Sequence, residues 1–259
     1  MDQETGDRHQ CRHLVAGPAR EQHSGQGSGL RPVVEGVLTS AKALLPSGGS
    51  YVYRRNGEAA SVSEHFSFEA AREGCLTRST RDAPSFGTRI EVLAWSDAPL
   101  SPRIHRFEVT SWRAGSCARA TYSHKDGRIE VEREAAVGEV AWSLEASTET
   151  LLYPLMRVFL GPLILAVARR GHADVVLPSI LDPADAVAWL SPISELRTAR
   201  LVAASETPLE DKGPRADRYQ FLTSRYDADS SFWIDSSGQL VRYLFPEPSG
   251  ALWDVRLEV

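Results

Sequence analysis

Alternation of apolar and polar residues, the pattern of half-buried β-strands, runs through most of the chain from Tyr51 onward. Asn56-Gly57 and Asp126-Gly127 each join two such segments, and both dipeptides suit the positive φ angles of a two-residue hairpin turn. Short strands with polar turns between them are typical of an antiparallel meander, sandwich or barrel. Strands are expected at residues 51–55, 58–70, 75–80, 88–95, 104–112, 118–124, 128–134, 140–144, 173–177, 197–206, 218–223, 231–235, 239–245 and 252–259.

Two segments depart from this pattern and predict helices. Apolar residues at helical spacing in the segment 34–45, followed by Pro46, predict a short N-terminal helix. Residues 148–170 are apolar on nearly every side, and Ser147 or Thr148 can cap their start while Gly171 follows their end. A helix of that kind is either enclosed by protein or placed in lipid.

The membrane alternative for the second helix has two weaknesses. The apolar run 151–168 is only at the lower limit of about 17 residues for a spanning helix, and Arg157 interrupts it. Strand patterns also continue on both sides of it, so a spanning helix would divide one sheet across a bilayer. The expected fold is therefore mainly β: an antiparallel curved sheet or half-barrel enclosing one long apolar helix, with a short N-terminal helix.

Composition divides the chain and limits its partners. Residues 1–31 are rich in Gly, Gln, Ser and His and predict a flexible leader, which leaves 32–259 as a single β-rich domain with a helical insertion near 148–170. Lys and Arg total 29 against 34 acidic residues, a net charge of −5 that argues against nucleic acid as a partner. No apolar signal segment opens the sequence, so a cytoplasmic location is expected, and the oligomeric state is left open.

Several kinds of chemistry lack their motifs. The three cysteines, Cys11, Cys75 and Cys117, are too widely spaced for a metal site or a disulfide framework. The sequence also contains no GxSxG, HExxH or Walker motif. No cofactor and no metal is therefore expected, which leaves binding or cofactor-free catalysis.

Period-two alternation indicates which polar side chains share a face with apolar ones. Glu64 and His105 are the candidate catalytic residues, because a desolvated carboxyl and an imidazole can both carry protons near neutral pH. Arg157, Tyr219 and His124 are the candidate substrate-binding residues. Each also has a structural interpretation. His105, for instance, would be a hydrogen-bonded core histidine beside Phe107 and Val109, and Arg157 would pair with Glu64 or Glu149.

The order of elements resembles that of bacterial lipoprotein-carrier-like proteins. Many strands precede an apolar helix about two-thirds along the chain, and strands with a Phe232-Trp233-Ile234-Asp235 and Leu240-Val241-Arg242-Tyr243 hairpin follow it. In that group a strongly curved antiparallel sheet forms a half-barrel around helices and an apolar cavity. The resemblance covers residues 51–259 and implies such a cavity here. Because the chain lacks the export signal and the lipoprotein cysteine of that group, it does not imply an export role.

Three functions fit these observations. The first is binding of an apolar or amphipathic small molecule, lipid-like, terpenoid or polyketide, in a β-sheet cavity. The second is a cofactor-free cyclase, isomerase or hydratase acting on such a molecule in natural-product or lipid biosynthesis. The third is a membrane-associated scaffold in which the apolar helix makes peripheral contact with lipid and Arg169-Arg170 lies at the headgroups.

Overall fold

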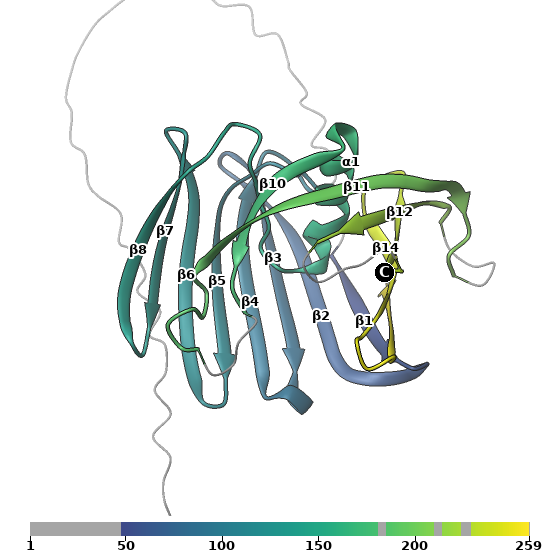
Figure 1. Ribbon diagram of the computed structural model, residues 1–259, viewed down its shortest axis with the longest axis horizontal. Coiled ribbons are helices and arrows are strands. Elements are labelled where there is room, and N and C mark those ends of the chain that lie inside the picture. The colour runs from purple at the N-terminus through teal and green to yellow at the C-terminus, as the bar shows by residue number, and fades with distance from the viewer. Residues whose placement is uncertain (1–47, 181–184, 210–213, 224–228, 259) are drawn as a thin grey trace, which may run out of the picture. The chain divides into compact units, whose positions relative to one another are not determined.

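Strands account for most of the structure, a computed structural model that describes residues 48–180, 185–209, 214–223 and 229–258 (Figure 1). The predicted leader and N-terminal helix lie outside the described residues. The strands are β1 (Gly49–Arg55), β2 (Glu58–Ala71), β3 (Gly74–Ala83), β4 (Thr88–Ser96), β5 (Ile104–Arg113), β6 (Ser116–Lys125), β7 (Arg128–Ala135), β8 (Gly138–Glu145), β9 (Leu151–Leu152), β10 (His172–Pro178), β11 (Pro192–Glu206), β12 (Ala216–Leu222), β13 (Ser231–Asp235), β14 (Leu240–Pro246) and β15 (Leu252–Glu258).

The 15 strands of the described residues all join one sheet, in the order β8-β7-β6-β5-β4-β3-β2-β1-β15-β14-β13-β12-β11-β10-β9. From β1 in the middle of the sheet, the chain steps strand by strand to one edge, and it then continues at the opposite edge. It then steps back to the middle, where β1 pairs antiparallel with β15 and Tyr53 lies opposite Val255. Every pairing is antiparallel except the short one between β9 and β10.

The predicted hairpin turns are confirmed. Asn56 and Gly57 have φ angles of 53° and 84°, and Asp126 and Gly127 have 50° and 75°. These angles suit type I′ turns, whose twist matches that of the flanking strands. Ala114-Gly115 adopts similar angles between β5 and β6, at a position where alanine gives no signal for a positive φ.

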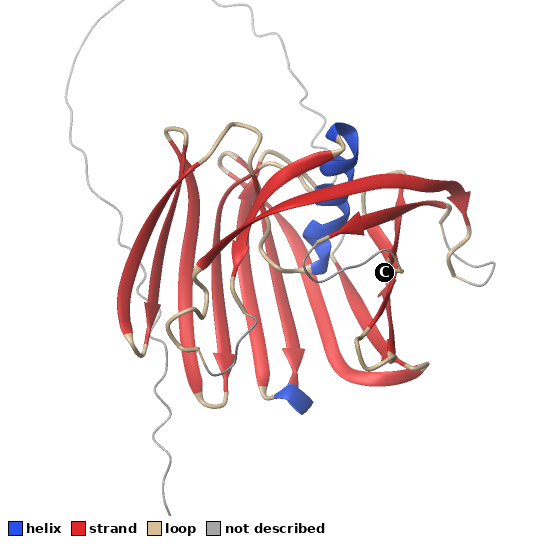
Figure 2. Ribbon diagram, in the orientation of Figure 1, coloured by secondary structure: helices blue, strands red, loops and turns tan. Residues whose placement is uncertain are grey.

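One face of the curved, unclosed sheet forms the core, and the mainly β class is as expected. Large side chains that alternate along the strands, Tyr51, Phe107 and Tyr122 among them, are completely buried on this face. β9, at one edge of the sheet, also contacts β5 in the opposite half, so the sheet curls toward itself. The helix α1 (Leu160–Arg170) packs against β10, β11 and β14 (Figure 2).

The expectation of one long helix over 148–170 is wrong. The helical part is α1 with a preceding 3₁₀ turn, η2 (Arg157–Phe159), while Leu151 and Leu152 form β9. Pro154 disfavours helical angles at Tyr153, whose N–H donates instead to the carbonyl of Val176 at 2.9 Å. A short, fully buried apolar run fits a strand as well as a helix, so its hydropathy alone did not separate the two.

The end of α1 is where the sequence placed it, at Arg169-Arg170 followed by Gly171 with φ of 82°. Its start is fixed by close packing: a Cβ at Gly161 would lie 2.5 Å from the Gly238 carbonyl oxygen and 2.8 Å from the Leu240 nitrogen. Within the described ranges, no helix combines the length and apolar character needed to cross a membrane. A second 3₁₀ turn, η1 (Pro84–Phe86), joins β3 to β4.

Candidate functional site

Glu64 lies on β2 at the buried face of the sheet, with no exposed surface. One carboxylate oxygen accepts the backbone N–H of Arg157 at 2.5 Å, and the other accepts the hydroxyl of Tyr53 at 3.1 Å. Burial raises the pKa of this carboxyl, while the nearby Arg81 and Arg157 guanidinium groups act to lower it. Its contacts therefore anchor the start of η2 to the sheet.

Arg157 begins η2 and is partly buried. Its guanidinium lies 5.0 Å from the centre of the Tyr243 ring and donates to the Tyr153 hydroxyl at 3.4 Å. The pairing with Glu64 that the sequence suggested is thus made through the main chain, and the side chain stacks on an aromatic ring. These contacts correspond to the structural interpretation of Arg157, in which neighbouring residues of the fold supply its partners.

His105 does not share the buried face with Phe107 and Val109, so its predicted orientation is wrong. Trp95 pairs with Arg106 but Ser96 pairs with Ile104, which leaves His105 as the extra residue of a β-bulge. The bulge interrupts the alternation, and about half of the His105 side chain is exposed, at 52%. Its Nε2 lies 2.7 Å from a carboxylate oxygen of Asp97.

The two candidate catalytic residues are far apart. Glu64 pairs with Arg81, Arg81 with Ile90, and Ile90 with Ser111, so Glu64 is level with Ser111 on β5. Six positions along β5 separate Ser111 from His105, about 20 Å at the rise of a β-strand. The structure does not bring these two side chains to one substrate.

His124 keeps the orientation that alternation predicted, on the face shared with Tyr122. It is half-buried, and its Nε2 lies 3.1 Å from the carbonyl oxygen of Thr150. Because that oxygen can only accept, Nε2 must carry the proton. Burial lowers the pKa of His124, the hydrogen bond to Thr150 acts to raise it, and the neighbouring His105 acts to lower it.

His105 and His124 meet at a pocket that we call the α1 pocket, about 540 Å³ in volume. It lies where α1 ends, between this helix, the start of β5, the end of β6 and the strand β9. Apolar side chains form part of its wall, and arginine and histidine side chains form much of the rest. Its lining residues are Pro102, Arg103, Ile104, His105, His124, Thr148, Thr150, Leu151, Leu152, Ala166, Arg169 and Arg170.

Sequence reasoning found some of these residues and missed others. His105 and His124 are candidates from the sequence, and Arg169 and Arg170 enter there as the helix end and as a possible contact with lipid headgroups. Arg103 was missed, because an arginine before a strand is ordinary in sequence. Only the curl of the sheet, which brings β9 against β5, places these segments side by side.

Tyr219 lies outside the α1 pocket. It is partly buried on β12, opposite Phe232 and Leu201, and it packs against the main core. Burial raises the pKa of its hydroxyl and the nearby Asp217 adds to this, while Arg169 acts to lower it. Its predicted role in substrate binding stays a prediction.

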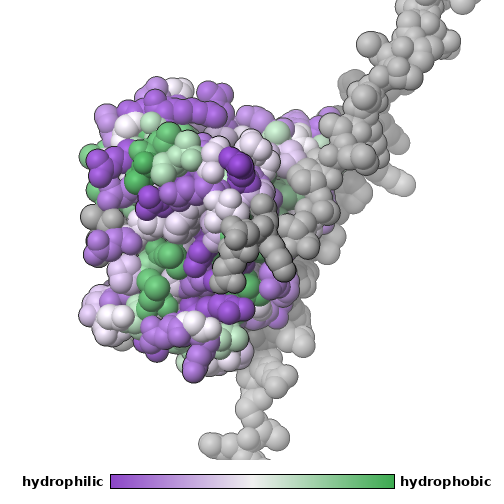
Figure 3. Space-filling model, turned by 90° about the vertical axis from the view of Figure 1, so that its right-hand side faces the viewer, coloured by the Kyte–Doolittle hydropathy of each residue, from purple (hydrophilic) through white to green (hydrophobic). Residues whose placement is uncertain are grey.

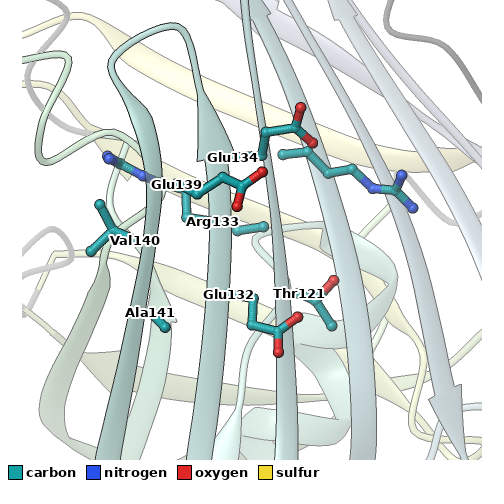
Figure 4. A pocket seen from close by; sticks show the side chains of 9 residues that line it. Thr121, Glu132, Arg133, Glu134, Glu139, Val140 and Ala141 are labelled. Atoms are coloured by element: carbon teal, nitrogen blue, oxygen red, sulfur yellow. The ribbon is translucent and has the colours of Figure 1, made fainter.

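A second hollow, of about 530 Å³, lies over β6, β7 and β8 (Figure 4). Glu132, Glu134 and Glu139 line it together with Arg119 and Arg133. The Arg133 guanidinium is buried and donates to the carbonyls of Ala186, Val187 and Trp189, so it holds the loop before β11 in place. This hollow mixes both signs of charge.

Exposed apolar surface gives no better candidate. Large apolar side chains with more than a third of their surface exposed include Leu196, Leu201, Val202 and Leu252. On the face seen in Figure 3, apolar patches are separated by hydrophilic residues. Scattered apolar residues of this kind are normal for a protein surface and need no partner.

A scan against protein-family models finds no match to this sequence, and a search of curated proteins finds none either. The resemblance to lipoprotein-carrier-like proteins therefore stays a prediction. What defines the class of this protein is the architecture of its described residues: a curved, unclosed sheet of 15 strands, one short α-helix, and a pocket with apolar and basic walls where that helix ends.

Proposed function

We propose that this protein binds an amphipathic small molecule, and that the α1 pocket is the binding site. The observation that carries the proposal is the composition of the pocket wall. Ile104, Leu151, Leu152 and Ala166 provide apolar surface, while guanidinium and imidazole groups share the same hollow. A molecule with an apolar part and a polar part matches this division.

The size and position of the pocket support this proposal. Its volume of about 540 Å³ falls within the range of roughly 300 to 1,000 Å³ of small-molecule sites. Leu151 and Leu152 are almost fully buried and belong to the main core, so the apolar wall is fixed by packing. A largely pre-formed wall lowers the entropic cost of holding a ligand.

Binding is favoured over the catalytic hypothesis by the placement of Glu64 and His105. General acid–base catalysis requires both groups within hydrogen-bond reach of one substrate. Glu64 instead binds the main chain of η2 and the Tyr53 hydroxyl, and His105 binds Asp97 at the far end of β5. Neither contact needs a substrate.

The proposal is tested with 8-anilinonaphthalene-1-sulfonate, an amphipathic probe that fluoresces in apolar surroundings, added to the full chain. Thr148 lines the pocket and is exposed, so Thr148→Trp fills the site with little risk to folding. Thr207→Trp is the matched control, because Thr207 is also exposed and lies after β11, outside the pocket lining.

We expect saturable binding of one probe molecule, lost or strongly weakened in Thr148→Trp and kept in Thr207→Trp. Native mass spectrometry of protein purified without detergent would give the stoichiometry directly, together with any ligand that copurifies. Equal probe binding by both variants, or none by the unmodified chain, would overturn the assignment of the α1 pocket as a binding site.

A further inference from the structure

We infer that the ligand of the α1 pocket carries a negatively charged group, such as a carboxylate, sulfonate or phosphate, which Arg103 and Arg169 bind. This inference rests on the proposed function and names the chemical class of its ligand. It is carried by the charges that line the pocket and by the partners that those charges have.

The charge of the pocket wall has one sign. Three arginines and two histidines line the α1 pocket, and no Asp or Glu is among the lining residues. The whole chain carries a net charge of −5, so this concentration of positive charge is local. Arginine is also well suited to carboxylate and phosphate oxygens, because its planar group donates two parallel hydrogen bonds.

Other hollows of the structure differ in this respect. The hollow over β6 to β8 holds Glu132, Glu134 and Glu139. Another, beside the β2–β3 turn, holds Glu73 and Asp97 along with its arginines. In each of these, acidic side chains offset the basic ones, so neither selects an anion.

The guanidinium groups of Arg103 and Arg169 make no ion pair or hydrogen bond with another side chain in the described part of the chain. Arg170 differs, because it donates to the carbonyl of Glu149 at 3.0 Å. His105 differs too, since its Nε2 already lies 2.7 Å from a carboxylate oxygen of Asp97. Two cations in the wall are therefore left for a ligand to pair with.

The apolar residues of the wall fix how such a ligand would lie. Leu151 and Leu152 are buried, whereas Arg103 and Arg169 are exposed. An apolar tail therefore lies against the β9 side chains, and the charged group lies toward the rim, where it keeps part of its hydration. This arrangement avoids the cost of burying an unpaired charge.

The test compares octane-1-sulfonate with 1-octanol by isothermal titration calorimetry on the full chain. The two ligands share the same tail and differ in the charge of the head, and the sulfonate stays charged at every pH used. We expect the sulfonate to bind roughly tenfold more tightly, and its advantage to shrink as ionic strength rises.

The double variant Arg103→Gln with Arg169→Gln should weaken sulfonate binding roughly 5- to 20-fold and leave octanol binding unchanged. The matched control is Arg54→Gln with Arg215→Gln, two exposed arginines outside the pocket that make no ion pair with described residues. This control should bind both ligands as the unmodified chain does.

Equal affinity for the two ligands, or no effect of the Arg103 and Arg169 substitutions, would overturn the anionic ligand but leave the pocket as a site for amphipathic molecules. If Thr148→Trp bound the fluorescent probe as well as the unmodified chain does, the assignment of the pocket as a binding site would be overturned instead. The two failures are therefore distinguishable.

A final experiment distinguishes two sources of the anionic group, a lipid headgroup in a bilayer and a free amphiphile. Sedimentation with phosphatidylglycerol vesicles, compared with phosphatidylcholine vesicles, detects recognition of a lipid headgroup in a bilayer. Retention on the first vesicles that disappears in the Arg103 and Arg169 variant would assign the anion to a membrane surface. Sulfonate binding without vesicle binding would assign it to a free amphiphile.

Discussion

Buried charges around Glu64 and exposed charges around the α1 pocket differ in where their partners come from. Glu64 accepts hydrogen bonds from Tyr53 and from the main chain of Arg157, so the fold itself satisfies it. Arg103 and Arg169 line a pocket and make no ion pair or hydrogen bond with another side chain among the described residues. Charge satisfied within the fold indicates a structural role, whereas the two open charges at the pocket are the basis on which we propose a ligand there.

The strongest test of this comparison is at Glu64. Glu64→Ala removes the acceptor of the Arg157 N–H and the Tyr53 hydroxyl, and it removes the carboxylate with which the Arg81 and Arg157 guanidinium groups interact electrostatically. We expect a loss of about 3 to 5 kcal/mol in the free energy of unfolding, measured by urea denaturation.

Glu64→Gln is the matched control, since it keeps a carbonyl oxygen for the Arg157 N–H. It should cost less than half as much, because the amide has nearly the same volume and keeps hydrogen-bonding groups near the Arg157 N–H and the Tyr53 hydroxyl. If Glu64→Ala unfolded at the same urea concentration as the unmodified chain, the structural role of Glu64 would be refuted.

The contact between α1 and β14 should give the next largest effect. Gly161→Ala would place a Cβ 2.5 Å from the Gly238 carbonyl oxygen, so the helix must move away from the strand. We expect a net loss of about 1 to 3 kcal/mol by urea denaturation, despite the better helix propensity of alanine. Gly250→Ala separates the steric effect, because nothing lies within 4 Å of that position and only its φ of 82° opposes alanine. If Gly161→Ala unfolded at the same urea concentration as the unmodified chain, the close-packing explanation would be contradicted.

The pH dependence of His124 should give a smaller effect. Its pKa is lowered in the folded protein by burial, so the unfolded chain binds a proton more readily. The stability contributed by neutral His124 is present above the ordinary histidine pKa and is lost as the pH falls from about 7 to about 5. The loss in the free energy of unfolding should be less than about 1 kcal/mol, because the ring is half-exposed.

His124→Gln should remove this part of the pH dependence and leave the rest of the curve unchanged, as measured by urea denaturation at several pH values. Charged groups near the ring are His105 with its partner Asp97, and the arginines of the α1 pocket. An identical pH dependence in the variant would mean that His124 titrates as it does in the unfolded chain.

His105 should give the smallest effect on stability. Its contact with Asp97 is exposed on both sides, with 52% and 56% of the side chains accessible. His105→Gln is expected to change the free energy of unfolding by no more than about 0.5 kcal/mol, as thermal and urea unfolding would show. A large loss would mean that the bulge at His105 depends on its side chain.

Strand positions were predictable because period two is a local property. The turns at Asn56-Gly57 and Asp126-Gly127 were predictable for the same reason, since each residue carries its own conformational preference. The bulge at His105 was not, because it depends on how Ile104 and Arg106 pair with a neighbouring strand. One inserted residue shifts the period-two pattern, so residues on the two sides of the bulge no longer follow one alternation.

The two ends of the helix α1 also differ in whether local sequence signals predict them. Its end at Arg169-Arg170 and Gly171 follows from local signals, and the structure confirms it. Its start does not, because Leu151 and Leu152 find a strand partner in β10, which lies beyond the helix in the chain. Glu64 could be recognised as an unusual carboxyl, but not as the group that binds the Arg157 main chain.

By itself, the sequence determined the β-rich class, most strand positions, two hairpin turns and the end of the helix, because each depends on the residues within one segment. The tertiary structure alone decided the sheet order, the extent of α1 and the composition of the α1 pocket. Those depend on contacts between segments distant in sequence, such as β9 with β5 and Gly161 with Gly238. Hydrophobic burial favours many such arrangements, and only backbone pairing and close packing select one of them.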